Sequence, residues 1–190
     1  VSIRPSNDNV VVSGPTVTGR GLIELNGADN VTINGDNPNS GGTNRNLTIQ
    51  NTAANTVTFT SCIRTATSTL ITNVDNNSVV NCILAGSGTG RNVSTFTTEV
   101  VTWGIIVSGN ASTLSNTTAP SALTSATSTM ASGQTAANMI ISNNNIVTVS
   151  RGVSINGAAT TVAPSLLISS NVIGNPTAGS VDQVTQNGIT

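Results

Sequence analysis

The sequence predicts an all-β fold built as a parallel solenoid, in which short strands stack coil upon coil. Three observations predict it. The apolar residues occur in short alternating clusters of about four to six residues, which is a strand pattern. No segment carries a helical stripe, and the helix formers Leu, Glu and Lys are scarce or absent. A short phrase of apolar, polar and apolar residues with flanking amides returns along the chain.

Thr, Asn and Ser dominate the composition, with 31, 26 and 23 copies among 190 residues. Only 7% of the residues are charged, against about 25% in typical domains. The abundance of Val, Ile and Thr argues against disorder, because disordered chains are poor in β-branched residues. A net charge of −1 with six scattered Arg gives no electrostatic footprint for nucleic acid. No run approaches the roughly 18 apolar residues of a membrane span, so we expect no membrane insertion.

The recurring phrase marks the first set of strands. Its copies are NVTIN at 30–34, NLTIQN at 46–51, NSVVNCI at 77–83, NMIISNNNI at 138–146 and SLLISSNVIG at 165–174. The intervals between the copies are irregular. We interpret the copies as equivalent positions on successive coils, because every coil of a solenoid needs the same residues at the same corners.

Further short strands are predicted between these copies. They cover residues 21–25, 56–60, 69–74, 103–109, 146–150 and 152–157. An antiparallel sandwich of short strands remains an alternative, because four Asn-Gly pairs offer tight hairpin turns. The self-similarity of the phrase favours the solenoid.

A parallel solenoid explains why the composition is rich in Asn and in aliphatic residues. Successive coils lie about 4.8 Å apart, so inward Val, Ile and Leu form stacked columns. Asn suits the corners, where it tolerates left-handed backbone and forms ladders of side-chain amides. We expect roughly six to eight coils. Residues 1–190 then form one β-helix domain. Because the chain begins with Val1 rather than Met, and VSIR already resembles a strand, we take it as a processed product or a piece of a longer polypeptide.

Several segments carry a resemblance to a known family. These are GADNVTINGD at 27–36, NLTIQNT at 46–52, NSVVNCI at 77–83 and NVIGNPTAG at 171–179. They resemble the right-handed, single-stranded parallel β-helix segments of very large bacterial surface proteins, similar to those exported by the type 9 secretion route. The resemblance covers most of 21–110 and 138–190, and Asn34 is often Asp in that family. It implies a right-handed coil and an extracellular or cell-surface location.

Residues 111–137 do not fit the repeat. This stretch is low-complexity Ser, Thr and Ala, and it separates two recognisable coils. We predict a lateral loop excursion that leaves the stack, either as a binding surface or as a tolerated surface insertion. Trp103, the single tryptophan, is expected to cap a coil or to cover a strand beside this loop.

The chain offers few groups for catalysis. Without His, Lys or Tyr, acid–base chemistry rests on seven carboxylates and six Arg. Asp29 and Asp36 bracket one strand and are candidates to approach Glu24 or Asp75 across coils. We expect them instead to be solvated turn residues at the beginning and end of that strand. Arg151 is expected on an outer face or bonded to a neighbouring loop. We therefore predict no catalytic, cofactor-binding or metal-binding residues.

The two cysteines, Cys62 and Cys82, each follow a strand phrase. Their spacing is close to the length of one expected coil, so stacking on adjacent coils, where a disulfide is geometrically possible, is one interpretation. The pair is equally compatible with two free thiols in the core, which is the favoured interpretation. A catalytic Cys would need a base, and the sequence has no His.

These observations lead to a function of a mechanical kind. The expected role is a structural or interaction solenoid in adhesion, matrix or surface assembly, without cofactors. Its partners would be further coils of its own chain, other subunits or carbohydrate. The first alternative is a polysaccharide-binding or polysaccharide-degrading module. A lower alternative is an ice-binding solenoid, which would need a flat Thr ladder around residues 56–60.

Overall fold

A computed structural model describes residues 1–54, 56–68, 70–86, 102–109, 120–157, 165–175, 184 and 187–190. Within these residues the regular structure consists of fifteen β-strands and no helix. The strands form three sheets of five. All twelve strand pairings are parallel.

The three sheets take every third strand of the chain. Sheet A contains β1 (Ser2–Ile3), β4 (Thr32–Asn34), β7 (Ser78–Val80), β10 (Ile140–Ser142) and β13 (Leu167–Ser169). Sheet B contains β2 (Val10–Gly14), β5 (Leu47–Asn51), β8 (Cys82–Ala85), β11 (Asn145–Val147) and β14 (Val172–Ile173). Sheet C contains β3 (Gly21–Asn26), β6 (Thr60–Thr67), β9 (Thr102–Gly109), β12 (Arg151–Ile155) and β15 (Asn187–Ile189).

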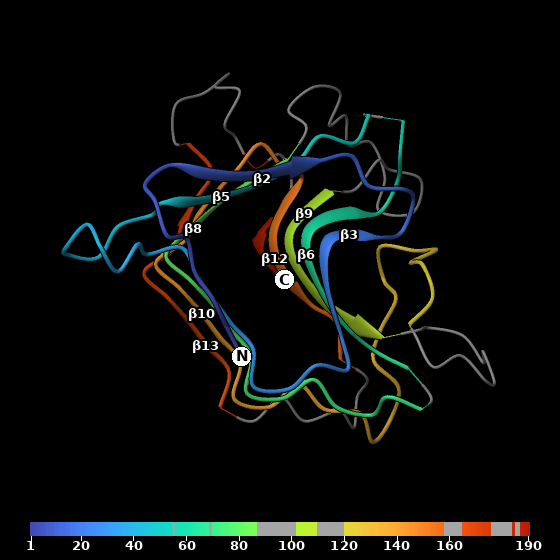
Figure 1. The fold of residues 1–190 in the computed structure, drawn as a ribbon. Coiled ribbons are helices and arrows are strands. Elements are labelled where there is room, and N and C mark those ends of the chain that lie inside the picture. Colours follow the sequence, from blue (N-terminus) through green and yellow to red (C-terminus); the bar gives the residue numbers. More distant parts are fainter. Residues whose placement is uncertain are drawn as a thin grey trace.

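This order is that of a parallel β-helix, since each coil gives one strand to each sheet before the next coil begins. The chain turns clockwise as it recedes from the viewer in Figure 1, which makes the solenoid right-handed. The described residues form five coils rather than the predicted six to eight. The estimate was too high because some coils are long: bonded positions on neighbouring coils are separated by 46 and 62 residues in the middle of the stack, and by 27 residues at its end.

The recurring phrase marks two different corners of the same coil. The copies at 30–34, 77–83, 138–146 and 165–174 include the sheet A strands β4, β7, β10 and β13. The copy at 46–51 instead forms β5 of sheet B, in the same coil as β4. The prediction that all copies lie on successive coils was therefore wrong for this one. Sheets A and B are both entered from an Asn-rich corner, so the same sequence signature appears at both.

Two predicted strands are not strands. Residues 56–59 and 70–74 lie in bends and loops around β6, which begins at Thr60. Asn73 forms an isolated parallel bridge with Thr135. Their β-branched residues resemble a strand in composition, but at these places the chain turns from one sheet to the next. The Thr-rich bend also offers no regular strand for the Thr ladder that ice binding would need.

The core consists of aliphatic columns that run along the axis. The column in sheet A contains Ile33, Val79 and Ile141, and that in sheet B contains Ile49, Leu84 and Ile146. All these side chains are buried, together with Ile63, Ile105 and Val153 of sheet C. The interior is mainly aliphatic, as predicted, with Cys62, Cys82, Met130 and Met139 also in the core cluster and no aromatic ring among its described residues.

A second inward column of sheet C contains glycine where sheet B side chains come close to its backbone. The strand registers align Leu22, Cys62, Gly104 and Gly152 at equivalent positions. A Cβ on Gly104 would lie 2.3 Å from Cγ2 of Ile146, and one on Gly152 would lie 2.5 Å from Cγ2 of Ile173. Glycine is needed here because the sheet B isoleucines occupy the space a side chain would take.

The outer face of sheet C is covered by residues 120–134, which we call the cover segment. Its Leu123 and Ala126 pack on Trp103 and Ile106 of β9, with Phe59 beside them. Every residue of β6 and β9 is consequently buried. Of the excursion predicted at 111–137, the part up to 119 lies outside the described residues. Residues 120–134 cover this sheet, and Thr135 returns to the stack, where it forms the isolated bridge with Asn73. Trp103 covers its strand beneath this segment, as one of the two expectations stated.

Candidate functional site

Asparagine occupies six of the ten described non-glycine positions that have a left-handed backbone. Asn9, Asn30, Asn76, Asn81, Asn138 and Asn143 have φ between 53° and 60°. Few other residues adopt this conformation at low cost, because the Asn side chain bonds to nearby backbone. The corner role predicted for Asn is therefore confirmed.

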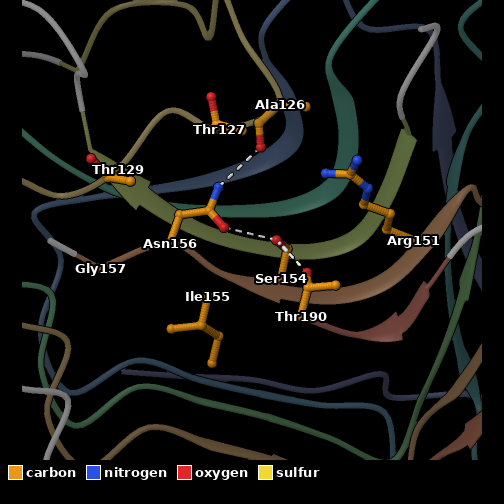
Figure 2. A pocket seen from close by; sticks show the side chains of 9 residues that line it. All are labelled: Ala126, Thr127, Thr129, Arg151, Ser154, Ile155, Asn156, Gly157 and Thr190. Atoms are coloured by element: carbon orange, nitrogen blue, oxygen red, sulfur yellow. Dashed lines mark hydrogen bonds between the residues drawn. The ribbon is translucent and has the colours of Figure 1, made fainter. Parts of the chain in front are cut away.

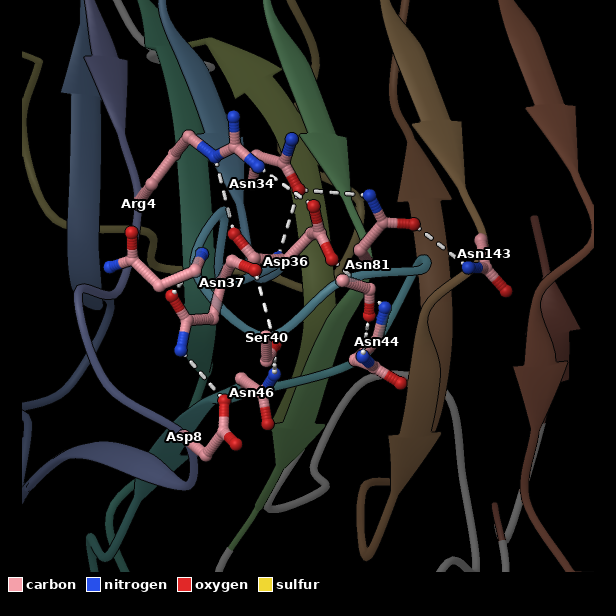
Figure 3. A network of polar contacts seen from close by, with 12 residues as sticks. Arg4, Asp8, Asn34, Asp36, Asn37, Ser40, Asn44, Asn46, Asn81 and Asn143 are labelled. Carbon is pink, nitrogen blue, oxygen red and sulfur yellow. Dashed lines mark hydrogen bonds and ion pairs between the residues drawn. The ribbon is translucent and has the colours of Figure 1, made fainter.

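These corner amides bond from coil to coil. Asn143 Nδ2 donates to Asn81 Oδ1 at 2.8 Å, and Asn81 Nδ2 donates to Asn34 Oδ1 at 2.8 Å. Figure 3 shows this ladder crossing the ends of neighbouring strands. Arg45 ends it by donating from Nη2 to Asn143 Oδ1 at 2.7 Å. At a second corner, Asn138 Nδ2 donates to Asn76 Oδ1. The predicted bonds between Asn side chains of neighbouring coils therefore occur at two corners.

Two of the candidate carboxylates form a similar ladder. Asp29 Oδ1 accepts the backbone N–H of Asp75 at 2.6 Å, and Asp75 Oδ1 accepts that of Ala137 at 2.6 Å. Each carboxylate thus holds the equivalent residue of the next coil. Asp29 and Asp75 do come together across coils, as the sequence hypothesis proposed. Their oxygens, however, are occupied by groups of the stack: each Oδ1 accepts a backbone N–H, and the Asn73 amide and the Thr135 hydroxyl donate to Asp29 and Asp75 respectively.

The other two candidate carboxylates lie elsewhere. Asp36 pairs with Arg4 at 2.7 Å in the loop that follows β4. Glu24 lies on the outer face of sheet C, where Arg20 is 2.7 Å and Arg64 is 3.4 Å from its carboxylate oxygens. Within the described residues no three His, Cys, Asp or Glu side chains gather in a way that would hold a metal ion. The four carboxylates therefore have three separate structural roles. Asp29 and Asp75 bond between coils, Asp36 pairs with Arg4, and Glu24 pairs with two Arg on sheet C.

The two cysteines belong to different columns. Cys62 in β6 aligns with Gly104, whereas Cys82 in β8 aligns with Leu47 and Asn144. They are not stacked, and both are free thiols buried in the core. Burial raises the pKa of each thiol to about 12. Of the two alternatives, free core thiols are correct.

We expect neither thiol to react with a disulfide reagent in the native chain at pH 8, and both to react after unfolding in guanidinium. The reason is burial in the thiol form, since only the thiolate is nucleophilic.

The unfolded thiols ionise near pH 9.0 and the native ones near pH 12, so above pH 9 the unfolded state holds fewer protons. The free energy of unfolding should then fall as the pH rises from 9 to 12, and this slope should be smaller in the Cys62→Ala/Cys82→Ala variant. Rapid native labelling would contradict this placement.

One pocket of about 330 Å³ opens at the edge of sheet C beside the cover segment. Its walls are Ala126, Thr127, Thr129, Arg151, Ser154, Ile155, Asn156, Gly157 and Thr190. Figure 2 shows Asn156 bonding to Ala126 O, and Ser154 lying between Asn156 and Thr190. Arg151 lies on the outer face of sheet C, as predicted, with its guanidinium at the pocket wall.

The sequence did not identify this pocket. Its hydroxyl and amide groups come from Thr, Ser and Asn, the commonest residues of the chain, so no local pattern marks them. Only Arg151 had been singled out. The wall is assembled from segments that are distant in the chain, since Asn156 Nδ2 bonds to Ala126 O with a separation of 30 residues.

The fold and these corners define the class of the protein as a right-handed parallel β-helix. Comparisons with protein-family models, with curated proteins and with solved structures found no match. In the described part of the chain no helix is long and apolar enough to cross a membrane.

Proposed function

We propose that this chain is a structural and interaction β-solenoid of a bacterial secreted or cell-surface protein. Its work would be adhesion, matrix formation or surface assembly, without catalysis. The observation that carries the proposal is the use of the polar corner groups. Asp29, Asp75, Asn81 and Asn143 all bond to a neighbouring coil instead of converging on a shared cavity.

Such bonds make the stack resistant to separation of its coils. Each coil contacts its neighbours, and the stack can lengthen without the limit that a globular core imposes. The sparse charge, the absence of Lys and the resemblance to type 9-exported surface proteins support an extracellular location. Neighbouring coils of a longer polypeptide, other subunits and carbohydrate are the partners we propose.

A mechanical and an enzymatic measurement together test this function. In single-molecule pulling from the two ends, coils should detach one at a time, with lengthening steps that match coils of 27 to 62 residues. Incubation with neutral and acidic polysaccharides should release no new chain ends. Polysaccharide cleavage that is lost in Asp29→Asn or Asp36→Asn but kept in the control Asp8→Asn would overturn the proposal in favour of an enzyme.

The pocket favours carbohydrate binding as a second candidate. Thr127, Thr129, Ser154 and Asn156 place hydroxyl and amide groups around one cavity, and such groups bind sugar hydroxyls. Calorimetric titration with neutral and acidic oligosaccharides tests it. Binding should weaken in Thr129→Ala and stay unchanged in Thr48→Ala, a threonine on sheet B. The absence of any heat of binding would rule this candidate out.

A further inference from the structure

Charged and aromatic side chains are unevenly distributed over the three sheets. The ten described strands of sheets A and B contain neither kind of residue. The strands of sheet C contain Glu24, Arg64, Trp103 and Arg151, and all four lie on its outer face. Since sheets A and B stack without such residues, the stacking of coils does not explain their presence on sheet C.

The cover segment lies on this outer face and is attached at a narrow base. A Cβ on Gly109, the last residue of β9, would lie 2.7 Å from Cα of Met130. Two points distant in sequence are therefore in contact. Beyond them, Gln134 ties the chain back to the stack, because its Nε2 donates to Ser68 O at 2.6 Å. Insertions whose ends lie close together are those that a fold gains or loses most easily.

Side-chain donors of the stack hold the cover segment by its backbone oxygens. The segment, yellow in Figure 1, lies along the outer side of sheet C. Arg20 Nη1 donates to Pro120 O at 2.7 Å, and Arg64 Nη2 donates to Ser121 O at 2.7 Å. Asn156 Nδ2 donates to two further carbonyl groups of the segment. These donors bind oxygen atoms whatever side chain accompanies them, so oxygens of another molecule can take the same places.

The cover segment leaves polar groups of this face unsatisfied. Ser61 Oγ, Arg64 Nε, Trp103 Nε1 and Ser108 Oγ are buried and have no hydrogen-bond partner among the described residues. Their side chains are at most 1% exposed. Ser61 and Trp103 are aligned in β6 and β9, so these two groups are neighbours. Buried polar groups are nearly always bonded in native proteins, and this set indicates a face shaped for an occupant with more polar groups.

We propose that the outer face of sheet C binds an acidic oligosaccharide, and that the cover segment occupies this site until it is displaced. Hydroxyl groups of the sugar bond to Ser61 and to the indole N–H of Trp103. A sugar ring packs on Trp103 where Leu123 lies in this structure. A carboxylate accepts from Arg20 and Arg64 in place of the carbonyl oxygens of the cover segment. The inference rests on the proposal that carbohydrate is a partner of the solenoid, and it places that partner beneath the cover segment.

Charge selects an acidic sugar over a neutral one. Arg20 and Arg64 face a single carboxylate, that of Glu24. The cover segment, residues 120–134, contains no charged side chain. These three groups therefore keep one positive charge in excess, which a carboxylate of the ligand neutralises. The closed segment competes with the ligand, so the apparent affinity falls by the fraction of molecules in which the face is open.

The experiment compares the full chain with a cover-less variant, in which a Gly-Ser pair replaces residues 110–128. The contact between Gly109 and Met130 permits this short link. Binding of an alginate hexasaccharide is followed by the fluorescence of Trp103, the single tryptophan. The cover-less variant should bind it about tenfold or more tightly than the full chain, and should bind the neutral maltohexaose far more weakly. Removal of Gly41 and Gly42 from an exposed loop is the matched control and should leave binding as in the full chain.

Two substitutions in the cover-less variant locate the bound sugar. Arg64→Gln should lose most of the binding of the alginate hexasaccharide, because it removes the charge that the carboxylate needs. Thr129→Ala, on the wall of the pocket beside sheet C, should retain it. The reverse result would place the sugar in the pocket and overturn the inference.

Leu123→Ser provides a second route that keeps the chain length. It weakens the packing of the cover segment on Trp103, so acrylamide should quench Trp103 more and the alginate hexasaccharide should bind more tightly than in the wild type. Circular dichroism and thermal unfolding establish that each variant is folded. Folded variants in which Trp103 stays inaccessible, or is accessible without tighter binding of this sugar, overturn the inference.

A synthetic peptide of residues 118–131 separates a sugar site from a peptide site. It should compete with the alginate hexasaccharide for the cover-less variant. Binding of the peptide without binding of the sugar would make this a peptide-binding face and overturn the inference. None of these outcomes affects the structural function, which fails on polysaccharide cleavage.

Discussion

Replacement of Arg64 by Met is expected to lower the free energy of unfolding by about 3 kcal/mol, because it removes one member of a buried charged network. The Arg64 side chain is 0% exposed and lies between sheet C and the cover segment. Its Nη2 donates to Ser121 O at 2.7 Å, and its Nη1 donates to Gly19 O at 3.2 Å. Both carbonyl groups would lose this donor in the variant, and Met cannot replace it.

The charge of this guanidinium depends on its surroundings. Burial lowers the pKa of Arg64, and the neighbouring carboxylate of Glu24 raises it again in part. Glu24 keeps Arg20, Gly21 N–H and Asn26 Nδ2 as partners after the substitution. We therefore expect the lost stability to come mainly from weaker attachment of the cover segment to sheet C.

Chemical denaturation and hydrogen exchange measure the two parts of this prediction. Exchange should accelerate in residues 120–131 more than in sheets A and B. The matched control is Arg4→Met, which removes an exposed pair with Asp36 and should cost only about 0.2–1 kcal/mol. Equal losses in the two variants, or unchanged exchange in the cover segment, would contradict the role assigned to Arg64.

Replacement of Asn144 by Ala is expected to lower the free energy of unfolding by about 2–4 kcal/mol, since it strands buried polar groups and leaves a cavity. Asn144 is fully buried at the corner before β11. Its Oδ1 accepts the N–H of Cys82, and its Nδ2 donates to Val79 O and to Asn171 Oδ1. One side chain thus joins three consecutive coils.

Equilibrium unfolding in urea checks this prediction, with Asn39→Ala as the control. Asn39 is exposed and donates a single side-chain bond, to Ser6 O at 3.1 Å. Water replaces that bond readily, so the control should cost less than about 1 kcal/mol. If both variants lost the same stability, the internal amides would not be what holds the coils in register.

The strand chemistry and the corners could be predicted from the sequence because they are local. The phrases at 77–83 and 138–146 are short clusters of β-branched apolar residues, and each includes an Asn at the left-handed corner, a conformation that Asn tolerates at low cost. These features fix how each segment folds and which side chains face inward. The aliphatic interior, the amide ladders and the parallel coil follow from them.

The register between coils was decided by tertiary structure. Asn138 bonds to its equivalent Asn76 across a separation of 62 residues, whereas Asn144 bonds to Asn171 of the next coil across only 27 residues. Insertions of such different lengths between strands hide the coil period, which is why the number of coils was overestimated. For the same reason Cys62 and Cys82, although close in sequence, lie in different sheets of different coils.

The placement of the polar groups was also beyond the sequence. Asp29 was expected to be a solvated turn residue, but the coil stacking directs its carboxylate onto the backbone N–H of Asp75 in the next coil. The cover segment has a low-complexity sequence with no pattern that predicts packing, yet its Leu123 and Ala126 bury Trp103. Local preference determines which backbone shape each segment adopts, whereas contacts between distant segments form only when the whole stack assembles.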